Sequence, residues 1–279
     1  MPKISKNYLD NVEDGLVHVG DHQRLNSSLI EKCLCHIHDG TGDPEACKRI
    51  LKSHAEALAL MDWFADHDLT RCKQDAYVAG KLDRILYQKA PLTGIYSPGA
   101  PFQSMLMPLL SDHQGLIAWL IRFDGIDLKR AHKGGAFEFI AHQAKLALRG
   151  EWDMLAERSE RFLHDPPGRM ARFAPDNRFH LALAKHDING MENALAEIVT
   201  PKEVKWRNEH EGYTGWFIVR HAVIYAKIAW RHGFQVQVDT PWIPKAWLPI
   251  EPLPVYEDPY PFMRSFDIEA PVPKVPIPK

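Results

Sequence analysis

The sequence has 279 residues, of which 45% are hydrophobic and 25% charged, a composition that excludes a disordered, collagen-like or disulfide-scaffold chain. Its net charge of −2 argues against a dedicated nucleic-acid-binding protein, because such proteins carry a basic excess. The longest apolar run, Leu116–Ile121, is too short to cross a membrane. The N-terminal residues lack the apolar stretch of a signal peptide, so we expect a cytoplasmic protein.

The first quarter of the chain is acidic. Residues 1–70 contain seven Lys and Arg against twelve Asp and Glu, a local charge of −5. Such a surface can attract a basic partner over a distance, although a simply solvated surface accounts for the same charges. The candidate partner-binding residues of this segment are Asp10, Glu13, Asp14, Asp62, Asp66 and Asp68.

Three helices are predicted in an N-terminal part, residues 1–90. Apolar residues recur at helical spacing after Asn26 or Ser27, which can act as the N-cap of the first helix. Asp43 and Pro44 provide a cap and a first-turn proline for the second helix. The three helices are expected over residues 26–40, 43–65 and 70–88.

A loop and a second helical part follow. Residues 91–101 hold three prolines and two glycines and predict a loop, after which helical periodicity returns over 101–248. Ala147–Leu155 and Leu183–Met191 align at an offset of 36 residues, and each contains a helix end, an acidic turn and a new helix. This pattern predicts tetratricopeptide-like helical hairpins stacked side by side. The helices are expected over 102–110, 113–123 with Asp112 as its cap, 137–149, 153–163, 176–185, 189–199, 201–209 and 216–232.

The end of the chain has a different composition. Phe234–Val238 alternates apolar and polar residues as a short strand does, and 11 of the 21 prolines lie in the last 39 residues. The aromatic residues there predict an extended segment lying over the helices, because disordered segments are poor in aromatics. We therefore predict an all-α fold of stacked antiparallel helical hairpins with one short strand and a proline-rich extended tail, 249–279. The three parts are expected to form one compact domain.

One short segment is rich in the residue types that bind metals. Cys33, Cys35, His36 and His38 fall within six residues. On a helix these side chains point to different sides, since Cys33 faces the core with Ile37, so they cannot surround one ion. We therefore predict neither a metal site nor a cofactor.

Histidine followed by aspartate occurs more often than chance predicts. Metal-dependent phosphohydrolases use a His…His-Asp…Asp ligand set, which keeps that activity as an alternative function. Each pair also lies at a predicted helix boundary, where aspartate can cap a helix and histidine favours a helix C-terminus. Because capping explains the excess, we predict no catalytic residue. The pairs are His38-Asp39, His67-Asp68, His164-Asp165 and His186-Asp187.

Two other groups of polar residues have structural explanations. Five arginines between Arg158 and Arg178 could grip phosphate, but the acidic residues among them favour a salt-bridged helix surface. The helix over 216–232 is apolar on most of its circumference and is predicted to be buried. Arg220 and His221 within it must then find partners in a polar network.

Four features of the second half of the chain occur in a distinctive order. They are an acidic hairpin turn at Leu148–Leu155, a second unit from Phe179 to Val199, an apolar helix ending at Arg231–Gly233, and the segment Val236–Pro244. In this order they resemble the immunity protein 49 family of bacterial polymorphic toxin systems. The resemblance covers about Phe137 to Leu248, and the preceding residues agree only in being helical.

This resemblance implies an all-α, non-enzymatic protein that binds and neutralises a cognate toxin made by the same cell. It implies no shared catalytic residues and no particular toxin, and the oligomeric state stays open. A nuclease toxin would suit the acidic N-terminal quarter, since carboxylates can plug a basic substrate channel. An alternative with the same architecture is a tetratricopeptide-like adaptor or regulatory scaffold that holds a peptide in a concave groove.

Overall fold

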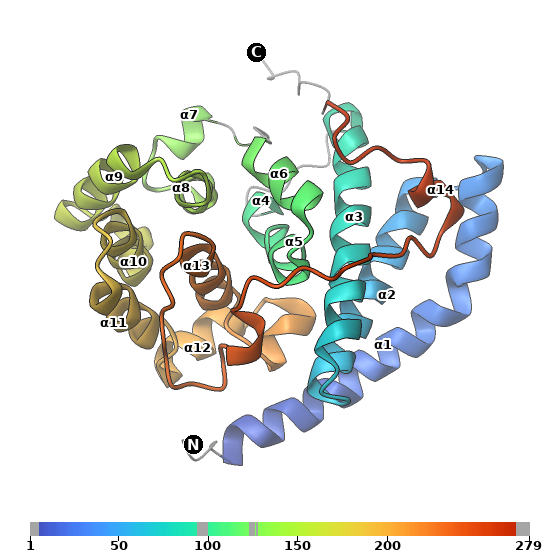
Figure 1. The fold of residues 1–279 in the computed structure, drawn as a ribbon, viewed down its shortest axis with the longest axis horizontal. Coiled ribbons are helices and arrows are strands. Elements are labelled where there is room, and N and C mark those ends of the chain that lie inside the picture. The colour runs from blue at the N-terminus through green and yellow to red at the C-terminus, as the bar shows by residue number, and fades with distance from the viewer. Residues whose placement is uncertain (1–5, 94–99, 123–125, 127, 272–279) are drawn as a thin grey trace. The chain divides into compact units, whose positions relative to one another are not determined.

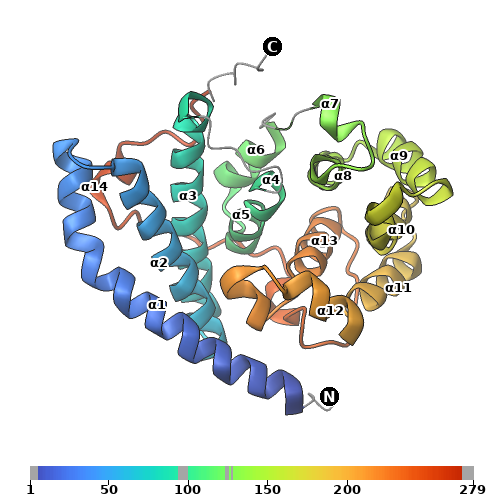
Figure 2. The same cartoon turned by 180° about the vertical axis from the view of Figure 1, so that it is seen from behind.

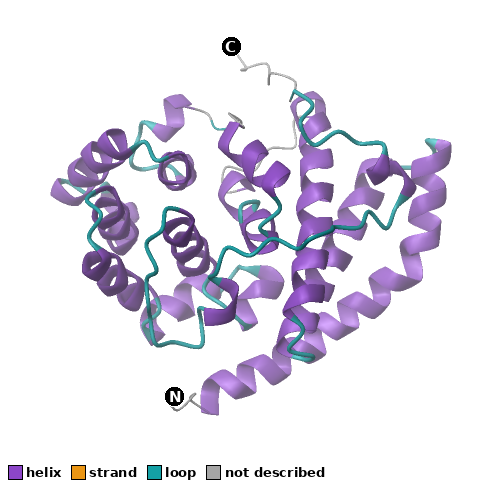
Figure 3. Cartoon of the chain, viewed as in Figure 1, coloured by secondary structure: helices purple, strands orange, loops and turns teal. Residues whose placement is uncertain are grey.

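The protein is built from helices joined by loops (Figure 1). A computed structural model describes residues 6–93, 100–122, 126 and 128–271. In this part of the chain all regular secondary structure is helical, which confirms the predicted all-α class (Figure 3). None of the helices described is both long enough and apolar enough to cross a bilayer. The chain divides into unit 1, residues 1–9, 97–106 and 124–250, and unit 2, residues 10–96, 107–123 and 251–279.

The long helix α1 (Lys6–Asp39) starts well before the helix predicted from residue 26. Asn26 was expected to be an N-cap, but it lies inside α1 with 9% of its surface exposed. The buried side chains Val19, Asn26 and Cys33 recur every seven residues, which keeps them on one side of the helix. The predicted start is wrong because polar residues outnumber apolar ones before Asn26 and obscure the helical spacing.

Helices α2 (Pro44–Phe64) and α3 (Leu69–Thr93) form a hairpin in unit 2 (Figure 2). The predicted cap of α2 is confirmed, since the Asp43 carboxylate accepts a 2.9 Å hydrogen bond from the backbone N–H of Ala46. The predicted loop over 91–101 is helical at its start, because α3 continues to Thr93. Residues 94–99 of that loop lie outside the described part.

Asp112 does not cap the next long helix, so that prediction is wrong. Helix α5 (Leu106–Ser111) precedes it and α6 (Gln114–Arg122) follows it. The backbone N–H of Leu116 donates to Nδ1 of His113 at 3.2 Å instead. Asp112 is 1% exposed, has a left-handed φ of 57°, and forms a 3.0 Å ion pair with Lys73 of α3. A lysine from a distant part of the sequence thus binds the carboxylate, which local spacing cannot reveal.

Unit 1 contains most of the remaining helices. They are α4 (Ala100–Gln103), α7 (Leu128–Ala131), α8 (Phe137–Arg149), α9 (Trp152–His164), α10 (Ala174–Ala184), α11 (Ile188–Ile198), α12 (Pro201–Asn208) and α13 (Arg220–Arg231), with 3-10 helices at Gly168–Phe173, Gly212–Trp216 and Lys245–Trp247. The pairs α8/α9 and α10/α11 are hairpins, and α10 packs against both α9 and α11 (Figure 2). Their turns use left-handed residues, Gly150 at φ 72° and His186 at φ 56°. This arrangement confirms the predicted stacked hairpins.

The strand predicted over Phe234–Val238 is absent, so this prediction is wrong. The segment has no regular secondary structure and pairs with no strand among the described residues (Figure 3). The backbone N–H of Gln237 donates to the Glu192 carboxylate at 2.6 Å, and that of Val236 donates to the oxygen of Phe234 at 2.9 Å. These local and side-chain acceptors take the place of a partner strand for the two N–H groups.

The proline-rich tail lies over helices, as the sequence predicts, and within unit 2 it contacts α3 (Figure 1). It includes the single helical turn α14 (Pro261–Arg264). Tyr260 is 8% exposed and Met263 is fully buried, so the tail contributes to the core of this unit. Residues 272–279 lie outside the described part. The domain boundaries expected from the sequence, 1–90, 101–248 and 249–279, stay a prediction.

Candidate interaction surface

An ion pair lies at the centre of unit 1. Asp176, in the first turn of α10, is fully buried. Arg207 of α12 donates two hydrogen bonds of 3.1 and 2.7 Å to its carboxylate, and the Tyr225 hydroxyl of α13 donates a third of 2.8 Å. Burial by itself raises the pKa of Asp176, but the charge and hydrogen bonds of Arg207 outweigh it, so the pKa lies below its ordinary value. The ion pair and the tyrosine hydrogen bond together join α10, α12 and α13 inside the unit.

Two neutral histidines lie beside this aspartate. Burial lowers the pKa of His180 to about 4 and that of His221 to about 3, so neither is charged at neutral pH. The ring of His180 packs against Tyr225 with 4.8 Å between centroids. Neither nitrogen of His180 has a hydrogen-bond partner in the described part of the chain. The ring therefore behaves as an apolar group of the core.

The prediction that Arg220 finds a partner is confirmed. Its guanidinium forms an ion pair of 3.0 Å with Glu211 and donates a 2.9 Å hydrogen bond to the hydroxyl of Thr214. These contacts join the start of α13 to the preceding 3-10 helix. They serve the architecture of unit 1, as the sequence indicated.

A second buried network ties α8, α9 and α10 together. Gln143 donates to Ser159 at 2.9 Å and to Asn177 at 3.2 Å, and it accepts a 2.9 Å hydrogen bond from Arg158. Arg158 also donates to the backbone oxygen of Ala131 at 2.6 Å. Arg158 was expected on a salt-bridged surface, but it is 2% exposed, so that expectation is wrong for this residue.

Other arginines of the basic stretch do lie on the surface and are paired. Arg178 forms a 2.5 Å ion pair with Glu197, and both side chains are close to half exposed. Arg161 lies 3.9 Å from Glu157. For these two arginines the predicted salt-bridged surface is confirmed.

A shallow groove of about 390 Å³ runs between α10 and α11 on the surface of unit 1. The Arg178–Glu197 pair joins the two helices beside it. Gly190 is required here, because a Cβ at this position would lie 2.4 Å from the Asp187 carboxylate and 2.9 Å from Ala182. The glycine thus lets the two helices approach closely.

The His-Asp pairs lie at helix ends, and capping is confirmed for two of them. Asp68 and Asp187 each accept a hydrogen bond, of 3.0 and 2.9 Å, from the backbone N–H three residues later, and so cap α3 and α11. His67 and His186 hold the left-handed positions just before these caps. In the described part of the chain, no three His, Cys, Asp or Glu side chains are grouped so that they could hold a metal ion.

Three of the candidate partner-binding residues lie together on α1. Asp10, Glu13 and Asp14 are exposed, and their spacing places them on one face of the helix. Val17 follows at the next position of this face and is 64% exposed. This part of α1 therefore offers carboxylates and an apolar side chain to solvent.

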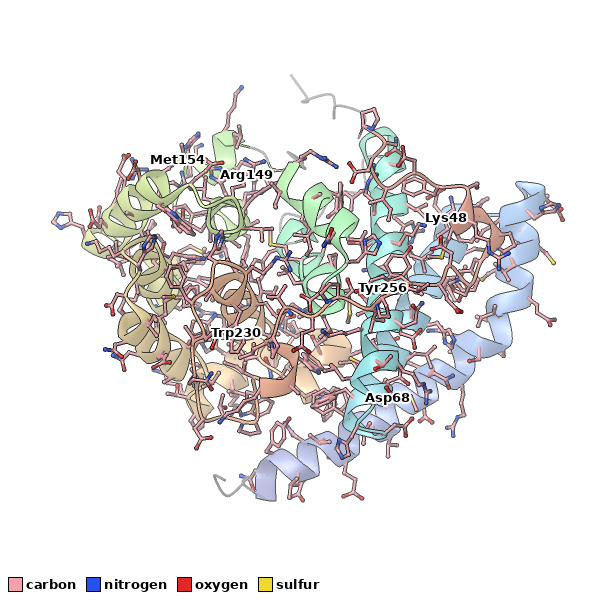
Figure 4. The ribbon with its side chains drawn as sticks, in the orientation of Figure 1. Lys48, Asp68, Arg149, Met154, Trp230 and Tyr256 are labelled. Carbon is pink, nitrogen blue, oxygen red and sulfur yellow. The ribbon has the colours of Figure 1, made fainter. Side chains whose placement is uncertain are left out.

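The other three candidates lie where α2 meets α3. Figure 4 labels Asp68 at this point. Asp66 is exposed and Asp68 half-buried, whereas Asp62 is 1% exposed and does not offer its carboxylate to solvent. Arg71 pairs with Asp62 at 2.9 Å and with Asp66 at 3.4 Å. Burial, together with the hydrogen bond and charge of Asp62, raises the pKa of Asp75 to about 8. Asp75 is therefore protonated at neutral pH and donates to Asp62.

Replacing Asp75 by asparagine is expected to flatten the pH dependence of unfolding. The folded pKa of about 8 exceeds the unfolded value of 3.8, so this group stabilises the fold most below pH 3.8. The contribution of Asp75 to the free energy of unfolding falls by less than about 1.4 kcal/mol per pH unit as the pH rises to about 8. Asparagine donates the same hydrogen bond at every pH. Urea unfolding at pH 5, 6.5 and 8 measures the slope.

The exposed variant Asp66→Asn is the control and should keep the wild-type slope. If Asp75→Asn and wild type give parallel stability curves between pH 5 and 8, the two carboxyl groups do not share a proton.

Neither Asp75 nor Asp176 was predicted from the sequence to be a site residue. Each stands on the apolar face of its predicted helix, Asp75 three residues before Val78 and Asp176 three residues before Phe179. A carboxylate within an apolar stripe is the signal that could have found them, since it must be paired or protonated when buried.

Residues 143–247 match the family model described as Immunity protein 49. The match confirms the resemblance found in the sequence, over less than half of the chain. No curated protein matches the chain, and no solved structure matches it.

Proposed function

From the likeness of residues 143–247 to the Immunity protein 49 family, we propose that this protein binds and neutralises a cognate bacterial toxin. The interaction is stoichiometric, takes place in the bacterial cytoplasm, and requires neither catalysis nor a cofactor. The family match is the observation that carries this proposal. It spans about half of α8 and all of α9 to α13, which include the hairpin α10/α11 and the side chains of both buried networks.

The use of polar groups in unit 1 supports a binding function. The buried polar side chains there bond to one another or to nearby backbone: Arg207 to Asp176, and Arg158 to Gln143 and the oxygen of Ala131. Such networks fix the hairpins in one arrangement. A rigid surface loses little entropy when it binds, and a stable complex needs about 800 Å² from each partner.

Two kinds of measurement test the proposal. Co-production of the full chain should restore growth to cells that make the toxin domain encoded beside its gene, and calorimetry should give a 1:1 complex. A toxin from an unrelated system is the control and should remain toxic. If the neighbouring toxin neither binds nor is neutralised, the proposal is wrong.

The exposed carboxylates of α1 are the proposed steering surface for a basic toxin, such as a nuclease with a positively charged substrate channel. The variant Asp10→Asn/Glu13→Gln/Asp14→Asn is expected to slow association about tenfold at low salt, because steering raises association rates by 10-fold or more. At physiological salt the difference should shrink. Stopped-flow or surface-plasmon-resonance rates measure it.

A control variant with the same loss of charge uses exposed carboxylates of unit 1. These are Asp153→Asn, Glu157→Gln and Glu209→Gln. It should leave the association rate close to that of wild type. Equal slowing by both variants would mean that net charge, and not this face of α1, steers the toxin. Asp66 and Asp68 are proposed members of the same surface, with Asp62 supporting them through Arg71.

The groove between α10 and α11 favours a second candidate function, that of an adaptor which binds a short peptide. An adaptor should bind an extended peptide in isolation, whereas an immunity protein should need a folded toxin domain. Binding of an unstructured toxin fragment with the affinity of the whole domain would favour the adaptor.

A further inference from the structure

One face of α3 recognises the tail of the chain. We propose that this face is a peptide-recognition site, that residues 251–271, here called the strap, are its built-in ligand, and that another extended acidic peptide can replace the strap. The inference goes beyond toxin neutralisation and does not depend on it. The side chains of α3 that form the face are Lys73, Gln74, Tyr77, Lys81, Arg84 and Gln88.

The spacing of these residues creates the site. Most of them recur every three or four positions, which aligns them along one side of a helix. The strap in turn has a sequence that suits an extended peptide, since its five prolines favour an extended backbone. A straight row of side chains can therefore follow an extended peptide over its length.

The face binds the backbone of the strap directly. The Gln74 amide donates to the oxygen of Glu257 at 2.8 Å and accepts from its N–H at 3.0 Å. Arg84 donates to the backbone oxygens of Ile268 at 3.2 Å and Ala270 at 2.5 Å. Backbone contacts of this kind hold extended peptides in many recognition domains and leave selectivity to side-chain contacts.

Asp258 of the strap makes one selective contact. Its carboxylate accepts a 2.9 Å hydrogen bond from the Tyr77 hydroxyl and a 2.7 Å charge-assisted hydrogen bond from Lys81. Lys81 is 4% exposed. An acidic residue is therefore required at this point of the ligand, since any other would leave a buried ammonium group unpaired.

Tyr256 makes the second selective contact (Figure 4). Its ring lies 4.9 Å from the rings of both Tyr77 and His113, measured between centroids. Its hydroxyl donates to the backbone oxygen of Ser111 and accepts a 2.9 Å hydrogen bond from Leu253. The ligand pattern is thus an aromatic residue two positions before an acidic one, in a proline-rich segment.

The charges of the two sides are complementary. The strap carries five carboxylates and one arginine. It faces the cations Lys73, Lys81 and Arg84 of α3, and its Glu269 forms a 2.5 Å ion pair with Arg122 of α6. A free ligand for this site should therefore be acidic.

The strap competes with any other peptide because it is tethered. A tethered ligand has an effective concentration of the order of 1 mM, so a free peptide gains access only when the strap is weakened. Weakening the strap alone should favour the free peptide. Weakening the face of α3 should not, because both ligands then lose the same contact.

The test uses the full chain and a fluorescein-labelled synthetic peptide with the sequence of residues 251–271. Asp258→Ala and Lys81→Met remove the same ion pair from opposite sides. Fluorescence anisotropy is expected to show that Asp258→Ala binds the peptide at least about tenfold more tightly than wild type, since each 1.4 kcal/mol of lost contact is tenfold. Lys81→Met should bind it no more tightly than wild type.

A third variant controls for changes in the strap that remove no contact with the face. Val255→Ser alters a side chain that is 70% exposed and should bind like wild type. Circular dichroism at the assay temperature establishes that each variant is folded. If Asp258→Ala is not folded, Asp258→Asn serves as the strap variant and Tyr77→Phe as the variant of the face of α3. Equal peptide affinities for the strap variant and the face variant, or no binding to either, would overturn the proposal.

Discussion

Replacing Asp176 by asparagine is expected to lower the free energy of unfolding by about 3 to 5 kcal/mol, the usual cost of breaking a buried ion pair. The variant removes the fully buried anion of Arg207, whose buried guanidinium then keeps a 3.1 Å pair with the less buried Glu203, and it removes the charged acceptor of the Tyr225 hydroxyl. Because the Asp176 carboxylate bonds to Arg207 of α12 and to Tyr225 of α13, its loss should affect the packing of α10 against both helices. Urea denaturation followed by tryptophan fluorescence measures it.

The surface pair Arg178–Glu197 is the matched control. It is also a charge-assisted contact to α10, but both side chains are close to half exposed. Glu197→Gln should cost less than about 1 kcal/mol, because solvent screens exposed pairs. If the two variants are equally stable, the buried pair does not hold unit 1 together.

Lowering the pH from 7 to 4 is expected to destabilise the protein by about 3 kcal/mol through His180 alone. The folded pKa of about 4 is below the unfolded value of 6.5, so the unfolded chain takes up a proton first. The penalty begins near pH 6.5 and is complete near pH 4, and a shift of one pKa unit corresponds to 1.36 kcal/mol. His221, with a folded pKa of about 3, should add to this loss.

The variant His180→Leu isolates this effect from other acid-labile groups. Leucine cannot take up a proton, and it sacrifices no hydrogen bond because neither ring nitrogen of His180 is bonded within the described residues. The variant should match wild type at pH 7 and exceed it in stability at pH 4.5, as measured by urea unfolding at both values. Parallel losses in the two proteins would show that His180 does not resist protonation.

Local signals in the sequence predicted the helices of unit 1 well. Gly150 and Asp187 mark a helix end and a helix start by their intrinsic preferences, and the structure places the turns of both hairpins there. Asp43 likewise marks the start of α2 as its N-cap. Helix boundaries that depend on a few neighbouring residues are accessible to such reasoning.

Features that depend on distant residues were not accessible. Asp112 has the residue type of a helix cap, but its partner Lys73 comes from another helix. Val236 belongs to an alternating pattern, but no second strand exists among the described residues to pair with it. In each case the sequence shows what a residue can do, and only tertiary packing decides what it does.

The same limit applies to the candidate partner-binding residues. Sequence charge identified Asp10, Glu13 and Asp14, and all three are exposed. It also included Asp62, which is buried beside Asp75. Net charge over a segment does not distinguish a carboxylate at the surface from one that is paired inside.

The helices α10 and α11 approach closely at Gly190. We therefore expect contacts between the two helices to contribute most of their stability, and outward-facing side chains such as the exposed Arg178–Glu197 pair to contribute little. Outward residues such as Asn193 can then be exchanged freely without unfolding the scaffold. Substitutions at these positions could therefore change the binding partner of the protein without changing its fold. A library randomised at these outward positions should retain a high proportion of well-expressed members.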